Sequence, residues 1–229
     1  MLIGLIGAMD VEIDGLKAVM EDQVSEVISS VEYCRGFIRG KECIAAVAGV
    51  GKVNAAVCAQ TMILKYSPDM IINIGVAGGL APELGTGDIA VADSVVEHDM
   101  DTTPTGEPPG YISGLERVYI ECNKSLADRL YNAASEIEGL TVCRGVIASG
   151  DQFIASAEQR NRIIDSFGAI AAEMEGASIG HVCAMSGVPF GVIRSISDGA
   201  NGESPASFLE FADMAAKNSI SIILKLLED

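Results

Sequence analysis

Short apolar runs recur along the chain and are mostly separated by segments with helical spacing. The run Leu2–Ile6 contains only Leu, Ile and Gly, which is typical of a strand covered on both faces. Arg39-Gly40-Lys41 predicts a tight turn between two such runs. The predicted strands are 2–6, 24–30, 33–38, 43–47, 70–74, 89–97, 141–148, 164–172 and 188–196.

Segments with apolar residues three and four positions apart predict the helices. The first of these has Asp10 as its expected N-cap. Its expected inner face is Ile13, Leu16, Val19 and Met20. The predicted helices are 11–21, 52–65, 123–137 (with Asn123 or Ser125 as its cap), 156–167, 176–185 and a last helix that begins at Pro205.

This order of elements predicts an α/β fold. Alternating strands and helices give a mostly parallel sheet with helices on both faces. The chain has 229 residues and no internal repeat or linker. We therefore expect one domain, 1–229, with three αβα layers around a central mixed, mostly parallel sheet.

Residues 99–114 interrupt this pattern with a segment rich in Pro, Gly and Thr. Loops of this length are uncommon in compact domains and often functional, so an active-site flap is slightly favoured over a surface excursion without a role.

Composition and charge exclude several classes of protein. Lys and Arg number 15 against 32 Asp and Glu, which gives a formal charge of -17. A chain this acidic repels phosphate backbones and anionic lipid, so we expect neither a nucleic acid nor a membrane as partner. The six cysteines lack C-x-x-C spacing and the two histidines lie far apart, so we expect no metal and no other cofactor. Free thiols and the lack of a leader or spanning segment predict a cytoplasmic protein.

Carboxylates stand where several predicted strands end. Glu12 follows the first strand, Glu173 and Glu175 lie between a strand and a helix, and Asp198 follows a strand that contains Arg194. Ligands bind at such strand ends in open α/β sheets, although acids also occur there as solvated turn residues or at helix N-termini. Acids without metal or histidine suit the cleavage of a glycosidic bond, in which one protonates the leaving group and another activates water.

Other motifs are weaker. Gly49-x-Gly51 lacks the third glycine and the acidic ribose partner of a dinucleotide fingerprint. The run 75–79 is able to cradle an anion, or it simply permits close approach of the backbone. We find neither a P-loop nor a Ser/His/Asp arrangement with a nucleophile elbow.

Taken together, six ordered motifs resemble the 5'-methylthioadenosine/S-adenosylhomocysteine nucleosidases, within the nucleoside phosphorylase/nucleosidase superfamily. The resemblance runs essentially end to end, and six matches in order are far more specific than any one of them. The motifs are Ile6-Gly7-Ala8-Met9 with Glu12, Gly49–Ala55, Ala77–Leu80, Val146–Ile154, Glu173–Ala177 and Arg194–Asp198.

The resemblance implies roles for three of the charged residues. Glu12 is similar to the base that activates the attacking water, and Asp198 to the acid that protonates N7 of adenine. Arg194 resembles a residue that positions Glu12 and the water. The ordinary alternatives are a first-turn helix acid, a cap after a strand, and a salt-bridge partner. Glu173 is interpreted as structural.

The resemblance also implies how the substrate is bound. Glu175 and Met174 match residues that hold the ribose hydroxyls. Phe153 matches the ring that stacks on adenine, and Ile154 offers backbone groups to the Watson–Crick edge. Phe153 is equally compatible with a place in the core.

At the 5' end of the substrate the match is less complete. Gly78 matches a backbone contact near the substrate, and Phe208 the lining of the alkylthio pocket, although its helical spacing also suits the core. Val76 stands where many members have serine, and Thr105 lies near where an aromatic residue is common. In the family the flap often comes from a neighbouring subunit, so the resemblance implies a homodimer.

The resemblance implies hydrolysis of 5'-methylthioadenosine and S-adenosylhomocysteine to adenine and the 5-thioribose product, in methionine salvage. Phosphate as nucleophile requires arginines near the first strand end and the Gly-rich turn, and neither 7–16 nor 75–87 contains one. Three alternatives stay open: a nucleoside phosphorylase of the same fold, a nucleosidase that prefers 6-amino-6-deoxyfutalosine, and a nucleoside-binding sensor without turnover.

Overall fold

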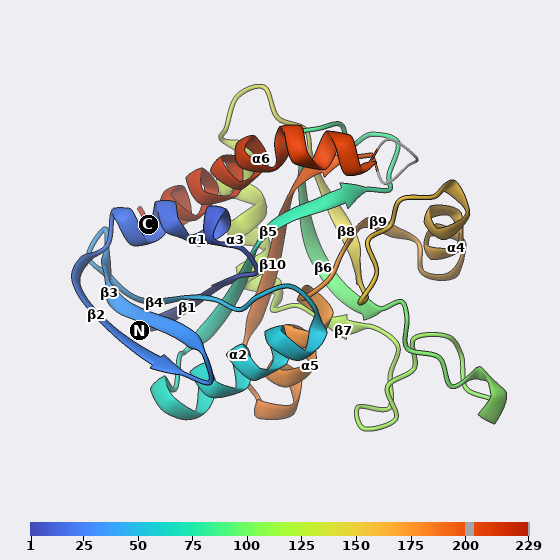
Figure 1. Ribbon diagram of the computed structural model, residues 1–229, viewed down its shortest axis with the longest axis horizontal. Coiled ribbons are helices and arrows are strands. Elements are labelled where there is room, and N and C mark those ends of the chain that lie inside the picture. The colour runs from blue at the N-terminus through green and yellow to red at the C-terminus, as the bar shows by residue number, and fades with distance from the viewer. Residues whose placement is uncertain (200–203, 229) are drawn as a thin grey trace.

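The computed structural model describes residues 1–199 and 204–228, and its strands form one ten-stranded sheet with helices on both sides (Figure 1). The strands are β1 (Leu2–Gly7), β2 (Glu21–Ile28), β3 (Val31–Ile38), β4 (Lys41–Val47), β5 (Met70–Gly79), β6 (Ile89–Glu97), β7 (Ile120–Glu121), β8 (Val142–Ser149), β9 (Ala169–Glu173) and β10 (Phe190–Asp198). The helices are α1 (Asp10–Ala18), α2 (Lys52–Tyr66), α3 (Lys124–Ser135), α4 (Ala157–Phe167), α5 (Gly176–Ser186), α6 (Ser204–Leu226) and the short 3₁₀ helix η1 (Thr103–Thr105).

The sheet is mixed, and part of it closes on itself. Parallel ladders join β4, β1, β5 and β10 in that order, and another parallel set joins β6, β8 and β9. Antiparallel ladders between β10 and β6 and between β5 and β9 connect the two sets, so that β10, β6, β8, β9 and β5 form a ring. The hairpin strands β2 and β3 extend the sheet beyond β4. The α/β fold class is confirmed, and the closure is a feature that the sequence pattern did not predict.

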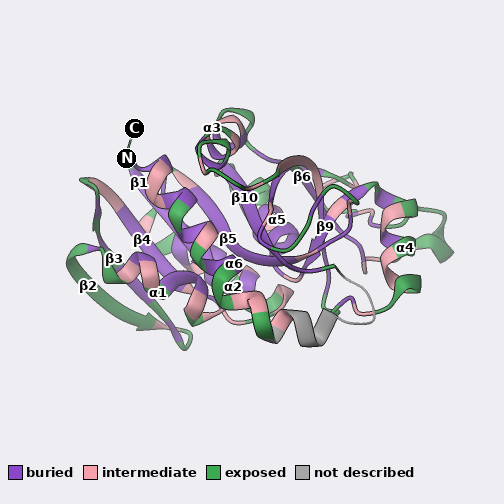
Figure 2. Ribbon diagram, turned by 90° about the horizontal axis from the view of Figure 1, so that it is seen from above, coloured by how far each residue is buried: buried purple, intermediate pink, exposed green. Residues whose placement is uncertain are grey.

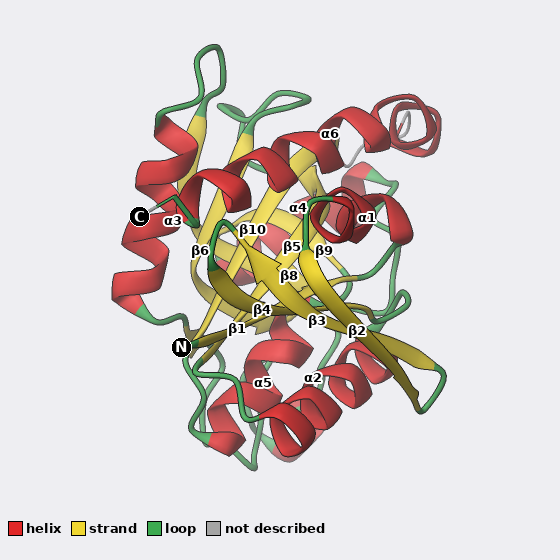
Figure 3. Cartoon of the chain, turned by 90° about the vertical axis from the view of Figure 1, so that its left-hand side faces the viewer, coloured by secondary structure: helices red, strands yellow, loops and turns green. Residues whose placement is uncertain are grey.

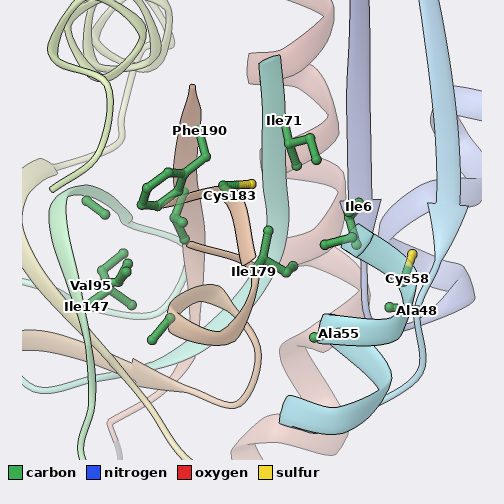
Figure 4. Packing of buried hydrophobic residues seen from close by; sticks show 14 of the residues in the cluster. Ile6, Ala48, Ala55, Cys58, Ile71, Val95, Ile147, Ile179, Cys183 and Phe190 are labelled. Atoms are coloured by element: carbon green, nitrogen blue, oxygen red, sulfur yellow. The ribbon is translucent and has the colours of Figure 1, made fainter. Parts of the chain in front are cut away.

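Two hydrophobic layers hold five of the helices to the sheet, and α4 packs in a smaller cluster through Ile163 and Phe167. On one side α1, α3 and α6 pack around Ile13, Leu130 and Ile223, and on the other α2 and α5 pack around Cys58 and Ile179 (Figures 1 and 3). Figure 4 shows the second layer, in which Ile6 of the sheet lies close to Cys58 of α2. Figure 2 shows that burial is concentrated in the central strands, whereas β2 at the edge is largely exposed.

Local sequence explains several element ends. The Asn123 side chain accepts a hydrogen bond from the Leu126 N–H at 3.0 Å and so caps α3. Arg39 and Gly40, with φ of 51° and 73°, form the tight turn between β3 and β4. The predicted positions of these two features are confirmed.

The first helix is shorter than the predicted 11–21. It ends at Ala18, because the Gln23 side chain donates to the carbonyls of Lys17 and Met20 and turns the chain into β2. Val19 is therefore exposed instead of lying on the inner face. Asp10 lies inside the helix, and Met9 occupies the N-cap position.

The predicted strand 164–172 is also wrong in its first part. Helix α4 continues through Phe167, with Ser156 as its N-cap, and ends at Gly168 in the left-handed region (φ 60°). Strand β9 begins only at Ala169, and runs to Glu173. The apolar residues Ile163 and Phe167 belong to the buried face of the helix, so helical spacing decides the structure here.

Residues 99–114 contain the short 3₁₀ helix η1, but no α-helix and no strand. The green segment that follows β6 in Figure 1 extends away from the sheet before the chain returns at β7. None of the helices within the described residues is both long and apolar enough to span a membrane.

Candidate active site

A cavity of about 290 Å³ opens where β1, β5, β9 and β10 end. This edge of a sheet, at the carboxyl ends of its parallel strands, is where α/β proteins bind ligands. The cavity contains every sequence-predicted site residue except Arg194. Its lining comprises Ala8, Met9, Glu12, Val50, Val76, Ala77, Gly78, Gln152, Phe153, Ile154, Ala172, Glu173, Met174, Glu175, Ser197, Asp198 and Phe208.

Glu12 lies in the first turn of α1, and its carboxylate is held by three backbone N–H groups. Oε2 accepts from Ala8 (2.7 Å) and Met9 (2.9 Å), and Oε1 accepts from Val76 (3.0 Å). A Cβ on Gly75 would stand 2.5 Å from Oε1, so only glycine lets the carboxylate reach this place. Val76 thus contributes its backbone to the site, whatever its side chain.

Burial makes this carboxylate a stronger base than a glutamate in water. Glu12 is 3% exposed, and desolvation raises its pKa despite the opposing effects of Arg194 and the three N–H groups. A carboxylate with a raised pKa is suited to accept a proton from water near neutral pH.

The Arg194 guanidinium donates hydrogen bonds to Glu173, Asn73 and the Ile193 carbonyl, and acts on Glu12 only through its charge. The guanidinium is 1% exposed. Glu173 also accepts the Ser149 hydroxyl. Although burial alone would raise the pKa of Glu173, the charge of Arg194 and these hydrogen bonds hold it below its usual value. The sequence-based expectation that Arg194 positions Glu12 is therefore modified: in this structure its direct partner is Glu173.

Glu173 in turn fixes the start of α5, as expected for a structural acid. Its carboxylate accepts from the backbone N–H groups of Glu175 (3.0 Å) and Gly176 (2.8 Å). A negative charge at a helix N-terminus is stabilised by the exposed N–H groups there. This geometry sets the direction in which the Glu175 side chain leaves the backbone.

Glu175 reaches the cavity from the N-cap position, directly before α5. Its Oε1 accepts from the Gly51 N–H at 2.8 Å, and the residue is 6% exposed. Burial, followed by the nearby charge of Glu173, raises the pKa of Glu175 to about 7. The carboxylate is thus poised between its neutral and charged forms at neutral pH.

Asp198 enters the cavity at the end of β10 because the strand bulges. The register with β5 shifts between Ile196 and Asp198, so that Ser197 is an extra residue on this strand. A bulge redirects the side chains beside it. Asp198 is 3% exposed, and its Oδ1 accepts from the Ser197 hydroxyl at 2.8 Å.

Two aromatic rings form one wall of the cavity. Phe153 and Phe208 meet edge to face, with 5.6 Å between their centroids and an interplanar angle of 87°. Phe153 is 45% exposed, so it lies at the mouth of the cavity and not in the core. Ile154, which is buried, follows it along the chain.

Sequence reasoning missed several lining residues: Met9, Val50, Gln152 and Ser197. Each lies inside or beside a motif that carried the family resemblance, and this was the available signal. No group of three His, Cys, Asp or Glu side chains suited to a metal occurs in the part of the chain that the structure describes.

Comparisons with known proteins agree with this geometry. A family model described as the phosphorylase superfamily matches residues 2–228. A 5'-methylthioadenosine/S-adenosylhomocysteine nucleosidase from Shewanella halifaxensis is 39% identical over 229 residues, which cover 100% of this chain and 99% of the relative.

Solved structures give the same result. The nucleosidase of that name from Neisseria meningitidis, in complex with methylthio-immucillin-A, aligns with a TM-score of 0.96 at 34% identity, covering 99% of this chain and 98% of that one. A futalosine hydrolase from Helicobacter pylori aligns with a TM-score of 0.94 at 35% identity, covering 99% and 97%.

The fold and the cavity are thus those of an enzyme that acts on a nucleoside. The chain belongs to the phosphorylase superfamily and, within it, to the family of 5'-methylthioadenosine/S-adenosylhomocysteine nucleosidases.

Proposed function

We propose that the protein is a hydrolase that cleaves the N-glycosidic bond of 5'-methylthioadenosine and S-adenosylhomocysteine, releasing adenine and the 5-thioribose product. The observation that carries this proposal is the meeting of Glu12, Glu175 and Asp198, which are far apart in the sequence, in one cavity. The full-length relatives that bear this activity in their names support it.

In the proposed reaction Glu12 and Asp198 act on opposite parts of the substrate. Glu12 takes a proton from a water molecule, whose oxygen bonds to C1' as the bond between C1' and N9 breaks. The electron pair of that bond passes to adenine, and Asp198 delivers a proton to N7, so that a neutral base leaves. The raised pKa of Glu12 supports its assignment as the base.

The ribose and adenine are held by neighbouring segments. We assign Glu175 and Met174 to the ribose hydroxyls, Phe153 to stacking on adenine and Ile154 to its Watson–Crick edge. A charged Glu175 would also favour the positive charge that develops on the sugar ring. We infer that the backbone of Gly78 completes the contacts near the substrate.

The apolar end of the cavity suits the 5'-alkylthio group. Met9, Val50 and Phe208 line it with side chains that carry no formal charge. Burial of a methylthio group there removes apolar surface from water.

Water is preferred to phosphate as the nucleophile for an electrostatic reason. Among the described residues that line the cavity, none is Lys or Arg, and four are carboxylates: Glu12, Glu173, Glu175 and Asp198. A phosphate dianion would find no compensating charge in that lining. The test is adenine release from methylthioadenosine with and without added phosphate. We expect equal rates; faster release with a ribose-1-phosphate product would identify a phosphorylase instead.

One observation favours a further nucleoside as an alternative substrate. The Helicobacter pylori structure named futalosine hydrolase is as similar to this chain as several of the nucleosidases are. We therefore include 6-amino-6-deoxyfutalosine as an alternative substrate of the same cavity. Comparison of kcat/KM for the three nucleosides ranks them.

We further propose a homodimer in which the 99–114 flap lies near the cavity of the neighbouring subunit. An apolar stripe on α2, continued by Val50 just before the helix, supports this interface. Val50, Val53, Val57 and Leu64 are exposed, with Val53 at 73% and Leu64 at 76%. Apolar side chains in a row on one helix face are typical of a surface that another chain covers. The stripe adjoins the cavity, because Val50 belongs to both.

Two further proposals concern the whole chain. The single sheet that joins the described strands supports one domain over 1–229. All six cysteines are free thiols, five of them buried, which supports a cytoplasmic location.

A further inference from the structure

Lys52, Asp99 and Asp151 form a closed ring of interactions beside the cavity. The Lys52 ammonium lies 2.6 Å from Asp99 Oδ1, and Asp99 Oδ2 accepts from the Asp151 N–H at 2.9 Å. Asp151 Oδ1 then accepts from the backbone N–H of Lys52 at 2.8 Å. The ring joins three segments: the start of α2, the start of the 99–114 flap and the loop after β8.

Both sides of the ring continue into the substrate cavity. Gly51, which precedes Lys52, donates its N–H to Glu175 at 2.8 Å. On the other side, Phe153 lies two residues after Asp151 and lines the cavity. A Cβ on Gly51 would stand 3.0 Å from Asp151 Oδ1, so the two loops are packed as closely as a glycine allows.

The ring is built from groups that are held more firmly than ordinary surface pairs. The side chains of Lys52 and Asp99 are 19% and 15% exposed. Glu97 adds a second carboxylate 3.1 Å from the ammonium, and its other oxygen contacts His181 Nδ1 at 3.0 Å. By contrast, Lys65 at the far end of α2 pairs with Glu26 at the surface, where both side chains are about half exposed.

The charges in the ring are mutually stabilised. Burial alone would lower the pKa of Lys52, but the Asp99 and Glu97 carboxylates raise it, and the ammonium lowers the pKa of Asp99 in return. The charged Lys52 thus ties the Gly51 segment to the base of the flap.

We propose that Lys52 and Asp151 are positioning residues for ribose recognition: their ring fixes the Gly51 N–H, and through it the carboxylate of Glu175. This inference rests on the proposed function, in which Glu175 binds the ribose hydroxyls. Neither residue lines the cavity, so both act through Gly51 and not by touching the substrate.

The test compares methylthioadenosine with its 3'-deoxy analogue, which lacks one hydroxyl but leaves the 2' substituent next to C1' unchanged. The ratio of the two kcat/KM values measures ribose recognition. We expect the wild-type protein to prefer the parent nucleoside by about tenfold or more, as a hydrogen bond to a charged group requires. Lys52→Met and Asp151→Ala are expected to reduce this ratio by about threefold or more, because the Glu175 carboxylate is no longer held in place.

Three further variants complete the experiment. Lys65→Met removes a cation from the same helix and is expected to keep the wild-type ratio. Lys52→Arg keeps the cation, so this variant is expected to retain most of the wild-type ratio of the two kcat/KM values. Glu175→Gln is expected to abolish most of the preference. A merely structural role of the ring would lower kcat/KM for both nucleosides equally and leave the ratio unchanged, so thermal unfolding is measured alongside.

The outcomes separate the two proposals. If Glu175→Gln retains the wild-type ratio, the ribose assignment of Glu175 is wrong and the inference fails with it. If Glu175→Gln loses the preference while Asp151→Ala and a folded Lys52→Met keep it, the inference alone is overturned. Because Asp151 is exposed, its variant decides the result even if Lys52→Met does not fold.

Discussion

Arg194 forms a buried ion pair with Glu173, which lines the same cavity as Glu12 and Glu175. Its positive charge helps to hold the pKa of Glu173 below its usual value, and through space it opposes the rise that burial causes in the pKa of Glu12. Arg194 therefore stabilises a site that otherwise concentrates negative charge. It also explains how Glu173 stays charged while its neighbour Glu175 has a pKa of about 7.

Loss of this arginine is expected to destabilise the protein strongly. Arg194→Met leaves the buried Glu173 carboxylate without its partner, which costs about 3–5 kcal/mol in the free energy of unfolding. Denaturant unfolding measures the effect. The control Arg35→Met breaks an exposed pair with Glu42 and is expected to cost less than about 1 kcal/mol. Equal effects of the two variants would show that the buried pair is not special.

Glu175 is expected to make stability depend on pH. Its pKa is about 7 in the folded protein and near 4.5 in the unfolded chain, so the folded state binds more protons between these values. The Glu175 contribution to stability therefore falls as the pH rises through this window. Glu175→Gln removes this pH-dependent contribution. The free energy of unfolding of the variant, relative to that of the wild type, is therefore expected to rise by about 1–3 kcal/mol between pH 5 and pH 8. A difference that stays constant over this range would contradict the assigned shift.

Gly75 is expected to be essential for the position of Glu12. Gly75→Ala places a Cβ 2.5 Å from Glu12 Oε1 and pushes the carboxylate out of its place. We expect kcat/KM to fall by about 100-fold, as for a displaced catalytic group. Gly85→Ala is the matched control, because the added Cβ makes only an ordinary contact at 3.5 Å. Wild-type activity in Gly75→Ala would mean that the carboxylate position is unimportant.

The apolar stripe on α2 is expected to hold two subunits together. Val53→Glu places a charge in the proposed interface and should raise the dimer dissociation constant by about tenfold or more. Sedimentation velocity over a range of concentrations measures it. Val24→Glu is the control, because Val24 on β2 is exposed to a similar extent, 71% against 73%. A monomeric wild-type protein, or equal behaviour of both variants, argues against the interface.

The sequence predicted the fold class and most of the cavity because both depend on local patterns. Strand ends are marked by the passage from an apolar run to glycine or an acid, and Glu12, Glu175 and Asp198 all stand at such places. The motifs of the family resemblance then joined these places in one site. The structure brings these residues to one cavity, while their chemical roles stay predictions.

The features that sequence reasoning missed depend on contacts between distant segments. Arg194 has its side-chain partners, Asn73 and Glu173, on two other strands. The β-bulge at Ser197 arises from the register between β10 and β5. The five-stranded ring of the sheet closes only because β10 pairs with both β5 and β6. The Gln23 side chain of β2 ends helix α1, although the apolar spacing in the sequence continues past that point.

The most direct measurement is the rate of adenine release from methylthioadenosine by Glu12→Gln and Asp198→Asn, each compared with the wild-type protein. If the two carboxylates act as base and acid on one nucleoside, each variant loses about 10²–10⁴-fold in rate while it still folds and binds the nucleoside. A folded variant of either kind that releases adenine at the wild-type rate would contradict the account.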